Sequence, residues 1–266
     1  MTELAIRPAK QRMLSPTTRH LLTTLGYVVL VIGIWQLYVA AFDVPVYLLP
    51  APDAVWNSLV EMATNGLLWG NLAYTVRNIL IGLIGGIIIG TGLGYLLWAS
   101  RWVREIAAPY IVVLQAAPKI AVAPLLVLWF GLGMESQLAL ILMLTFFPMM
   151  VSMNLGLSSI SSDVETLGRL LNMGRWRYFR TVQLPGSMPE LVSGAKIAVI
   201  DAMTGAFLAE YITAQEGLGF LMVLGNSSYN TPMLIASVIL TVIAGLAGFG
   251  AISLAEKRLL RWRTAR

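Results

Sequence analysis

Three kinds of side chain are absent or scarce in this 266-residue sequence, and each scarcity excludes a kind of chemistry. The absence of cysteine excludes disulfides, thiolate metal sites and cysteine nucleophiles. A single histidine, His20, argues against histidine metal sites and Ser-His-Asp hydrolysis. Charged residues make up only 12% of the chain and hydrophobic residues 58%, whereas a soluble domain is about a quarter charged. This composition is that of a membrane protein, and it favours a transporter, channel or scaffold over an enzyme with catalytic or metal-binding residues.

Six stretches are long and apolar enough to cross about 30 Å of hydrocarbon, which requires roughly 20 residues of helix. They run over 21–42, 71–99, 109–131, 136–158, 188–209 and 231–254. The first apolar run is too long for a cleaved signal peptide and is interpreted as a retained anchor. We therefore predict an all-α polytopic membrane protein with six transmembrane helices. A cytoplasmic segment (1–20), a transmembrane domain (21–254) and a basic cytoplasmic tail (255–266) make up the predicted organisation.

Two of these stretches have unusual local features. The third contains Pro118, Lys119 and Pro124, which predict a kinked or broken helix. The second is rich in glycine, which lets another helix approach closely. Its glycines are Gly82, Gly85, Gly86, Gly90, Gly92 and Gly94.

The basic residues are concentrated in one set of connecting segments, which predicts the orientation of the chain. Segments 1–20, 100–108, 159–186 and 255–266 carry 15 basic and 5 acidic residues. Segments 43–70, 132–135 and 210–230 carry six acids, Glu210 among them, and no base. Both termini are therefore expected in the cytoplasm, and the pI of about 9.6 reflects topology rather than nucleic-acid binding. The tail residues Lys257, Arg258, Arg261, Arg263 and Arg266 are also compatible with contact to anionic lipid.

The cytoplasmic loop 159–186 is predicted to form two short helices joined by a turn. Its first part has an amphipathic spacing of apolar residues at Val164, Leu167, Leu170 and Leu171. Ser162 and Asp163 are candidates to cap this helix. Asn172 and Gly174 tolerate a left-handed backbone, so the turn is expected there.

A second helix is predicted over 175–182 and is expected to stop at Pro185. It carries Trp176, Tyr178 and Phe179, and exposed aromatic side chains usually mark a contact with a partner. A solvated loop with no partner is the alternative interpretation.

At this point the sequence resembles a known family, the permease subunits of bacterial ABC importers, and in particular their nitrate, sulfonate and taurine branch. The loop is similar to that family's cytoplasmic EAA loop, which ends in a hydrophobic residue, a spacer and Leu-Pro, here Val182, Gln183, Leu184 and Pro185. Further similar segments are LLPAPDAVWNSLVEM (48–62), QAAPKIAVAPLLVLWFGLG (115–133), GAKIAV (194–199) and AEYITAQEGLGFLM (209–222).

The resemblance implies a type I ABC importer-like fold in which the loop is a coupling helix docked on a cytoplasmic ATPase. The loop departs from the family pattern at two positions, because the family's glutamate falls on Thr166 and its glycine on Asn172. Glu165 lies one residue earlier and is the alternative to Thr166. The residues that the resemblance assigns to coupling are Glu165, Thr166, Leu167, Leu171, Asn172, Gly174, Arg177, Val182, Leu184 and Pro185.

The resemblance also implies partners. The chain contains no GxxxxGK[ST] sequence, so ATP and Mg are expected to bind a partner ATPase and no cofactor to bind this chain. The implied assembly contains two ATPase subunits, a second identical permease copy and an extracytoplasmic binding protein in the bacterial inner membrane. Nitrate, taurine, sulfonates, bicarbonate and pyrimidine or aromatic nutrients are the implied substrates. An ion-driven secondary transporter is the alternative function, and an intramembrane enzyme has little support.

Four residues are candidates for the translocation path: Asp201, Lys119, Lys196 and Met150. Ionisable groups inside membrane spans are costly and therefore functional by default. Each also has a structural alternative. Lys119 and Lys196 could extend to the membrane surface, Asp201 could be satisfied by a neighbouring helix, and Met150 could belong to ordinary helix packing.

Overall fold

The computed structural model describes residues 16–213 and 215–260, and these residues form an all-helical structure. The long helices are α1 (Pro16–Ala41), α3 (Leu67–Ala99), α6 (Met134–Ser158), α9 (Leu184–Thr213) and α11 (Thr231–Leu259). The shorter elements are α2 (Pro52–Thr64), α4 (Arg101–Ala116), η1 (Lys119–Val122), α5 (Ala123–Phe130), α7 (Ser162–Leu170), α8 (Arg175–Tyr178), η2 (Phe179–Gln183) and α10 (Leu218–Ser227). Among the described residues, five helices can each cross a membrane, and a bent pair raises the number to six.

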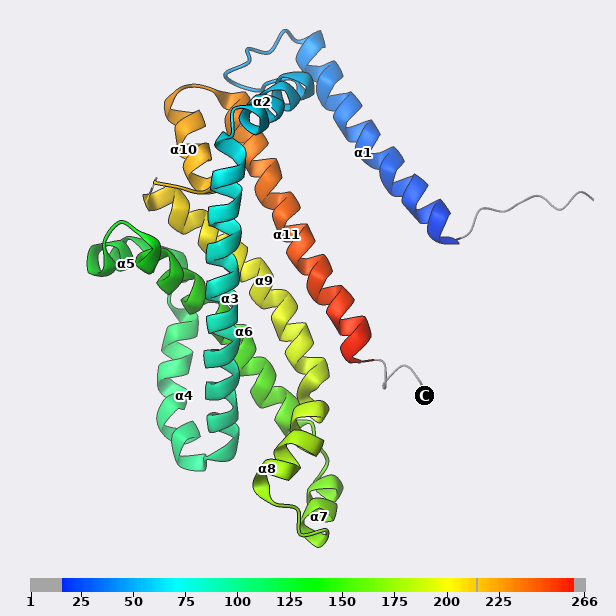
Figure 1. The fold of residues 1–266 in the computed structure, drawn as a ribbon, viewed down its shortest axis with the longest axis vertical. Helices are drawn as coiled ribbons and strands as arrows, with labels where there is room; N and C mark the ends of the chain where they lie inside the picture. The colour runs from blue at the N-terminus through cyan, green and yellow to red at the C-terminus, as the bar shows by residue number, and fades with distance from the viewer. Residues whose placement is uncertain (1–15, 214, 261–266) are drawn as a thin grey trace, which may run out of the picture.

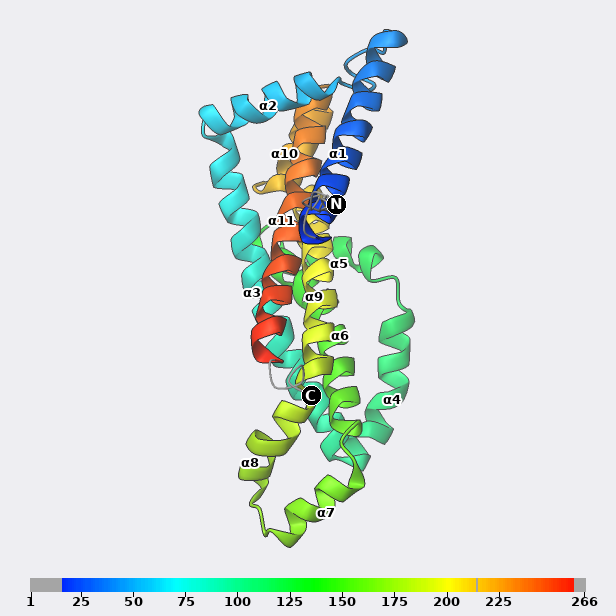
Figure 2. The same ribbon diagram turned by 90° about the vertical axis from the view of Figure 1, so that its right-hand side faces the viewer.

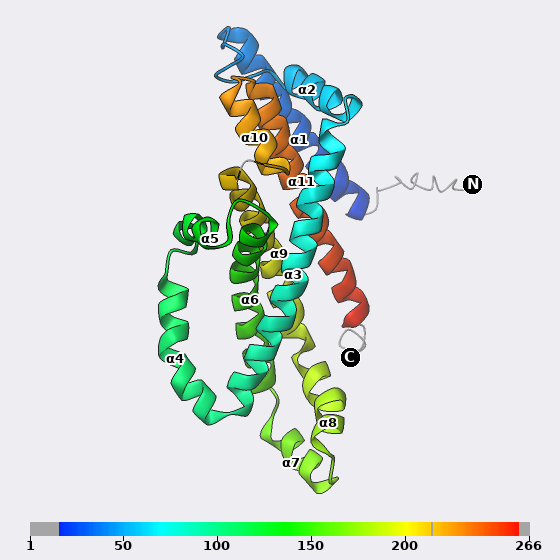
Figure 3. The ribbon, with the colours of Figure 1, turned by 60° about the vertical axis from the view of Figure 1, so that its left-hand side comes forward.

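The bundle is built around α3, α6 and α9, with α11 beside α9 (Figure 1). Helices α7 and α8 lie at one end of the molecule, and α2 and α10 lie at the opposite end (Figure 2). We call these the loop end and the far end. Helix α1 leans away from the bundle (Figure 1), and α4 with α5 forms a separate arm (Figure 3).

Glycine allows the central helices to approach closely, as predicted. Gly82, Gly86, Gly90 and Gly94 recur every four residues along α3 and all face α6. The α6 backbone lies so near that a Cβ at Gly90 would collide with the Phe146 carbonyl oxygen. Gly92 differs, because its side of α3 faces open space.

Helices α6 and α9 are in similarly close contact. A Cβ at Gly156 would lie 2.6 Å from the Ser187 Cβ, and one at Gly194 would lie 2.6 Å from the Ser152 Cβ. Small residues thus set a close approach between the two helices that the loop 159–186 connects.

The third predicted span is broken, as expected from its prolines. Helix α4 and the segment Lys119–Phe130 meet at 88°, and Pro118 lies at the bend. The predicted boundary at 109 is wrong, because α4 begins at Arg101 and takes in most of the predicted loop 100–108. Ser100 caps this start by accepting a hydrogen bond from the Val103 amide (3.4 Å).

Two helices at the far end, α2 and α10, fall in segments that hydropathy treated as loops. Both are too short to cross a membrane and so gave no signal in a search for spans. The predicted span 188–209 is also too short, since α9 runs from Leu184 to Thr213.

Candidate functional site

The loop between α6 and α9 contains two helical segments joined by a turn, as predicted. Helix α7 ends in a turn in which the Met173 amide donates to the Gly168 carbonyl (3.1 Å) and the Asn172 amide to the Arg169 carbonyl (3.0 Å). Asn172 has a φ of 49°, which confirms the left-handed position expected there. Gly174 has a φ of −60°, so the same expectation is wrong for Gly174.

The predicted cap of α7 is also wrong. The residue before the helix is Ser161, and it makes no side-chain cap hydrogen bond. Ser162 is the first helical residue, and Asp163 lies in the first turn. There the carboxylate of Asp163 is placed to interact favourably with the helix dipole instead.

The apolar stripe of α7 faces outward. Leu167, Leu170 and Leu171 are 54%, 75% and 64% exposed, and Val164 is 38% exposed. At this density, exposed leucine on a nine-residue helix is characteristic of an interaction surface. We refer to Val164, Leu167, Leu170 and Leu171 as the α7 stripe.

Aromatic contacts hold the second half of the loop on the bundle. The Phe179 ring meets the Tyr95 ring of α3 edge to face, with 5.2 Å between centroids. Trp176 stacks on Phe179 at 5.8 Å and lies under the Arg180 guanidinium. Because α7 packs on α8 through Gly168 and Tyr178, the whole loop is held as one unit.

The two candidates for the loop glutamate have different surroundings. Glu165 is paired with Arg169 at 3.5 Å and lines a hollow of about 490 Å³ between the loop and Trp98. Thr166 donates its hydroxyl to the Ser162 carbonyl (2.9 Å) within its own helix. Arg177 is exposed on α8.

Pro185 does not stop the chain's helical course. The segment η2 is a π-helical turn, and α9 begins directly after it at Leu184. Proline is tolerated in the first turn of a helix, where an amide donor is not required, and this explains why the prediction of a stop was wrong. Val182, Leu184 and Pro185 are all partly buried where the loop joins α9.

Asp201 and Lys119 lie on separate elements, within electrostatic range of each other. Asp201 lies on α9 and is half-buried, and its carboxylate experiences the positive charge of Lys119 on η1. The Lys119 ammonium lies 4.6 Å from the centroid of the Phe147 ring. Lys119 thus lies at the bend between α4 and α5.

The other two path candidates have structural partners. The Lys196 ammonium lies 2.6 Å from the Glu256 carboxylate of α11. Met150 is only 4% exposed and packs in a cluster with Leu97 and Phe147. Both environments are those of helix packing within one chain.

Glu210 is a buried acid that sequence reasoning placed in an exposed loop. It lies in the last turn of α9 with no exposed surface. Its Oε2 accepts hydrogen bonds from the Thr75 hydroxyl (2.8 Å) and the Gly219 amide (3.0 Å). The Thr75 hydroxyl oxygen in turn accepts from the Leu218 amide (2.8 Å). Glu210 therefore fixes the start of α10 against α3.

A second set of buried hydrogen bonds lies beside that of Glu210. The Asn78 amide donates to Gln137 (2.7 Å), and the Gln137 amide donates to the Thr213 hydroxyl (2.8 Å). Together the two sets of hydrogen bonds join α3, α6, α9 and α10 toward the far end of the bundle. An acid embedded in the apolar run FLAEYIT and followed by Gly217 and Gly219 was the sequence signal for this arrangement.

Comparison with known proteins gives consistent matches across most of the chain. Residues 49–261 match the family described as "Binding-protein-dependent transport system inner membrane component". A probable ABC transporter permease protein of Haemophilus influenzae is 34% identical, covering 85% of this chain and 92% of that protein. The formylaminopyrimidine transport permease protein ThiX of Halalkalibacterium halodurans is 32% identical, covering 90% of this chain and 95% of that protein. The taurine transport system permease protein TauC of Escherichia coli is 27% identical, covering 93% of this chain and 92% of that protein.

The fold also has a counterpart among solved structures. A chain of the inward-facing MetNI methionine ABC transporter superposes with a TM-score of 0.62 at 17% identity. The superposition covers 73% of this chain and 98% of that one. At this identity the match establishes the fold alone.

Proposed function

The chain belongs to the family of inner membrane components of binding-protein-dependent transport systems, and from this premise we propose how it works as an importer permease. It is a multi-pass permease subunit of an ABC importer, and in such systems ATP hydrolysis resides in separate subunits. This membership replaces the alternative of an ion-driven secondary transporter. We propose an assembly of two copies of this chain, two ATPase subunits that bind ATP and Mg, and an extracytoplasmic binding protein.

The α7 stripe is the observation that carries the coupling proposal. It presents three leucines more than half exposed on a loop held rigidly between α6 and α9. Burial of these leucines in a groove on an ATPase would remove apolar surface from water. Motion of the docked ATPase would then move α6 and α9, as alternating access requires.

Charge supports a cytoplasmic position for the loop end. The segments at this end carry the excess of lysine and arginine, and short basic loops face the cytoplasm. We accordingly place both termini and the α7 stripe in the cytoplasm, and α2 and α10 outside.

The arm formed by α4 and α5 supports pairing with a second copy. Every residue of α4 is at least partly exposed, and Tyr110 and Val113 are each 67% exposed. On α5, Leu128 and Trp129 are 76% and 65% exposed. A two-fold dimer in which these faces meet would cover them by the simplest closed symmetry.

Lys119 and Asp201 support a polar site on the translocation path. Next to Asp201 on α9, Ile197 and Ile200 are more than half exposed, so the charged pair interrupts an otherwise apolar face. A carboxylate and an ammonium within electrostatic range of each other suit a solute that has both hydrogen-bond donors and acceptors, such as a pyrimidine or a zwitterionic sulfonate. They suit a simple anion such as nitrate poorly.

Reconstitution with the partner ATPase and binding protein tests the coupling proposal. Leu167→Asp and Leu171→Asp should leave the permease in the membrane but greatly reduce ATPase co-purification, because a charge would be buried at the docked surface. Leu167→Met and Leu171→Met are the matched controls, since they keep an apolar side chain of similar volume at the same positions. Undiminished ATPase binding by both leucine variants would remove the α7 stripe from the interface.

A further inference from the structure

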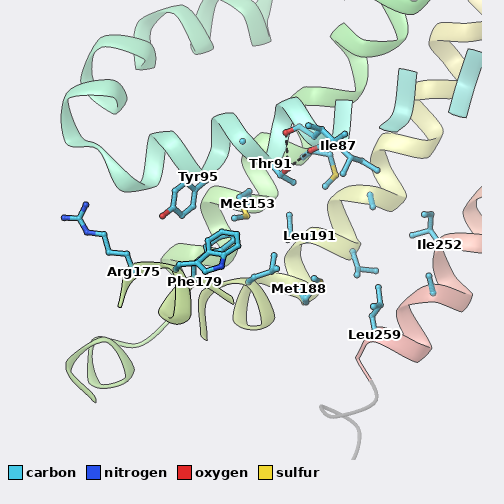
Figure 4. A pocket seen from close by; sticks show the side chains of 18 residues that line it. Ile87, Thr91, Tyr95, Met153, Arg175, Phe179, Met188, Leu191, Ile252 and Leu259 are labelled. Carbon is cyan, nitrogen blue, oxygen red and sulfur yellow. Dashed lines mark hydrogen bonds between the residues drawn. The ribbon is translucent and has the colours of Figure 1, made fainter. Parts of the chain in front are cut away.

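The two ends of the molecule offer surfaces of different chemistry. A groove of about 860 Å³ at the loop end is lined by apolar side chains of α3, α9 and α11, such as Met188 and Leu191 (Figure 4). The Thr91 hydroxyl in its wall already donates to the Ile87 carbonyl (2.6 Å), and the Arg175 side chain points out of the groove. The groove therefore offers almost no charge or hydrogen bonding, whereas the far end exposes aromatic and acidic side chains together.

Tyr229 follows α10 in a turn where glycine is the usual residue. The Asn230 amide donates to the Gly225 carbonyl (2.8 Å) and the Tyr229 amide to the Asn226 carbonyl (3.2 Å), which is the pattern of a Schellman motif. Tyr229 occupies the left-handed position of this motif with a φ of 55°, and this backbone is strained for a bulky residue. Its side chain is nevertheless 84% exposed, so it gains little packing within the chain. A strained and exposed aromatic residue indicates a contact outside the chain.

A hydrogen bond fixes a second aromatic residue next to this turn. The Thr231 hydroxyl, two residues after Tyr229, donates to the Tyr47 carbonyl in the segment between α1 and α2 (2.7 Å). Tyr47 and Leu48 are 67% and 69% exposed. Both connecting segments lie at the far end (Figure 1). We refer to Tyr47, Leu48 and Tyr229 as the outer patch.

Helix α2 adds acidic groups to the same end of the molecule, where it lies across the bundle (Figure 2). One face of α2 is buried through Val55, Ser58 and Met62. Its opposite face is exposed and carries Asp53, Trp56, Asn57, Val60 and Glu61.

The charge of this end argues for a protein partner rather than a lipid surface. No lysine or arginine occurs in segments 43–70 and 210–230. The nearest base along α3, Arg77, lies over the ring of Tyr74 on its own helix, 5.0 Å from the centroid. Helices that lie in a membrane interface are typically rich in lysine and arginine on their polar face, and α2 has the opposite charge. Exposed tyrosine and tryptophan are enriched in interfaces between proteins.

We propose that the outer patch and the exposed face of α2 dock the extracytoplasmic binding protein through a face of that protein rich in lysine and arginine. The proposal rests on the permease function and the orientation given under Proposed function. Cationic side chains fit both chemistries, because they pair with Asp53 and Glu61 and also lie favourably on the rings of Tyr229 and Trp56. The rings anchor the complex, and the acids steer its approach.

ATP hydrolysis by the reconstituted complex, titrated with the binding protein, tests the anchor. Tyr229→Gly removes the ring and relieves the strain of the turn, so the Tm should not fall. The concentration of binding protein that gives half-maximal stimulation should rise roughly tenfold, as expected for an aromatic anchor. Hydrolysis without binding protein should be unchanged. Tyr27→Ala is the control, because it removes a ring that is 66% exposed on α1, outside the surface.

Two results of this titration would count against the proposal in different ways. An unchanged half-maximal concentration for Tyr229→Gly, with a stimulated wild type, would overturn the docking site and leave the importer function intact. Failure of the binding protein to stimulate the wild type would overturn the importer function and the docking site with it.

The charge of the partner is tested by Glu61→Gln. At low ionic strength this change should raise the half-maximal concentration roughly threefold, and the difference should disappear at about 0.5 M salt. Glu105→Gln is the matched control, since Glu105 is an exposed acid in the segment 100–108 on the opposite side. An unchanged or lower half-maximal concentration for Glu61→Gln would overturn the basic partner face.

A second copy of the chain and lipid are the competing occupants, and the absence of native cysteine allows each to be detected. Leu48→Cys labelled with benzophenone maleimide should photocrosslink to the binding protein in the reconstituted complex. The matched control is Trp102→Cys, which is similarly exposed (77%) in the segment 100–108 and should give no such product. Crosslinks from position 48 to another permease copy or to lipid alone would overturn the proposal.

Discussion

Lys196 and Glu256 form an ion pair of 2.6 Å that joins α9 to α11 at the loop end of the bundle. Their side chains are 24% and 31% exposed, so the pair is only partly screened by solvent. The Lys196 ammonium also lies 5.8 Å from the centroid of the Phe249 ring. This pair accounts for a lysine that would otherwise be a costly charge in a membrane span.

Reversing either charge of this pair should destabilise the protein, and reversing both should restore it in part. Lys196→Glu and Glu256→Lys are each expected to lower the Tm in detergent, since each places like charges together. In the double variant the two side chains again carry opposite charges. The double-mutant cycle should therefore give a coupling free energy of about 1 kcal/mol, within the range of partly exposed pairs. Thermal melts of all four proteins complete the cycle. Additive losses would mean that the two side chains do not interact.

Removal of the Glu210 side chain should be among the most destabilising changes toward the far end of the bundle. Glu210→Ala leaves the Thr75 hydroxyl and the Gly219 amide without their acceptor, at a cost of about 1–3 kcal/mol for each buried group left unsatisfied. Glu210→Gln keeps an acceptor oxygen and should cost less. Thermal melts should rank wild type above Gln and Gln above Ala, and a different order would count against this role.

The glycine stripe of α3 should not tolerate a large side chain. Gly90→Leu drives a side chain toward the Phe146 carbonyl oxygen, which belongs to the α6 backbone and cannot rotate away. Overpacking of this kind costs about 1–3 kcal/mol, so yield and Tm should both fall. In Gly70→Leu the side chain meets open space, and both quantities should stay at the wild-type level.

Asp201 and Lys119 should affect transport more than stability. Asp201→Asn keeps the shape of the side chain and removes its charge, so the assembly should survive. Uptake in proteoliposomes should fall roughly tenfold or more, corresponding to one charge-assisted contact with the solute. Lys119→Gln should have a comparable effect.

A purely structural role would give a different result. Asp201→Asn and Asp201→Leu would then lower the Tm together, and whatever assembled would transport normally. If both variants fold and transport like the wild type, the site on the path is not formed by this pair.

The sequence predicted the long helices well because their signal is local. Hydropathy located every span to within a few residues except the third, where the loop boundary at 109 was set by Arg101, Arg104 and Glu105. These residues are hydrophilic, yet Ser100 caps a helix that includes them. Hydropathy reports burial in lipid and does not report where a helix begins.

The sequence did not predict contacts between segments that lie far apart along the chain. Nothing local in the sequence relates Lys119 to Asp201 or Lys196 to Glu256, because only the packing of separate helices brings them together. Glu210 was misplaced for the same reason, since its partner Thr75 lies on α3. The turn at Asn172, by contrast, depends on one residue's own φ preference and was predicted correctly.

The close packing of α6 on α9 at Gly156 and Gly194 has a mechanical meaning. Two helices whose backbones are in contact cannot move closer together. A force on the loop that joins them would therefore rotate both helices as one rigid unit. With 30 residues, α9 is roughly 45 Å long. A swing of about 10° at the loop end would therefore carry the far end of α9, with Glu210 and α10, sideways by roughly 8 Å, a distance comparable to the width of a small nutrient molecule.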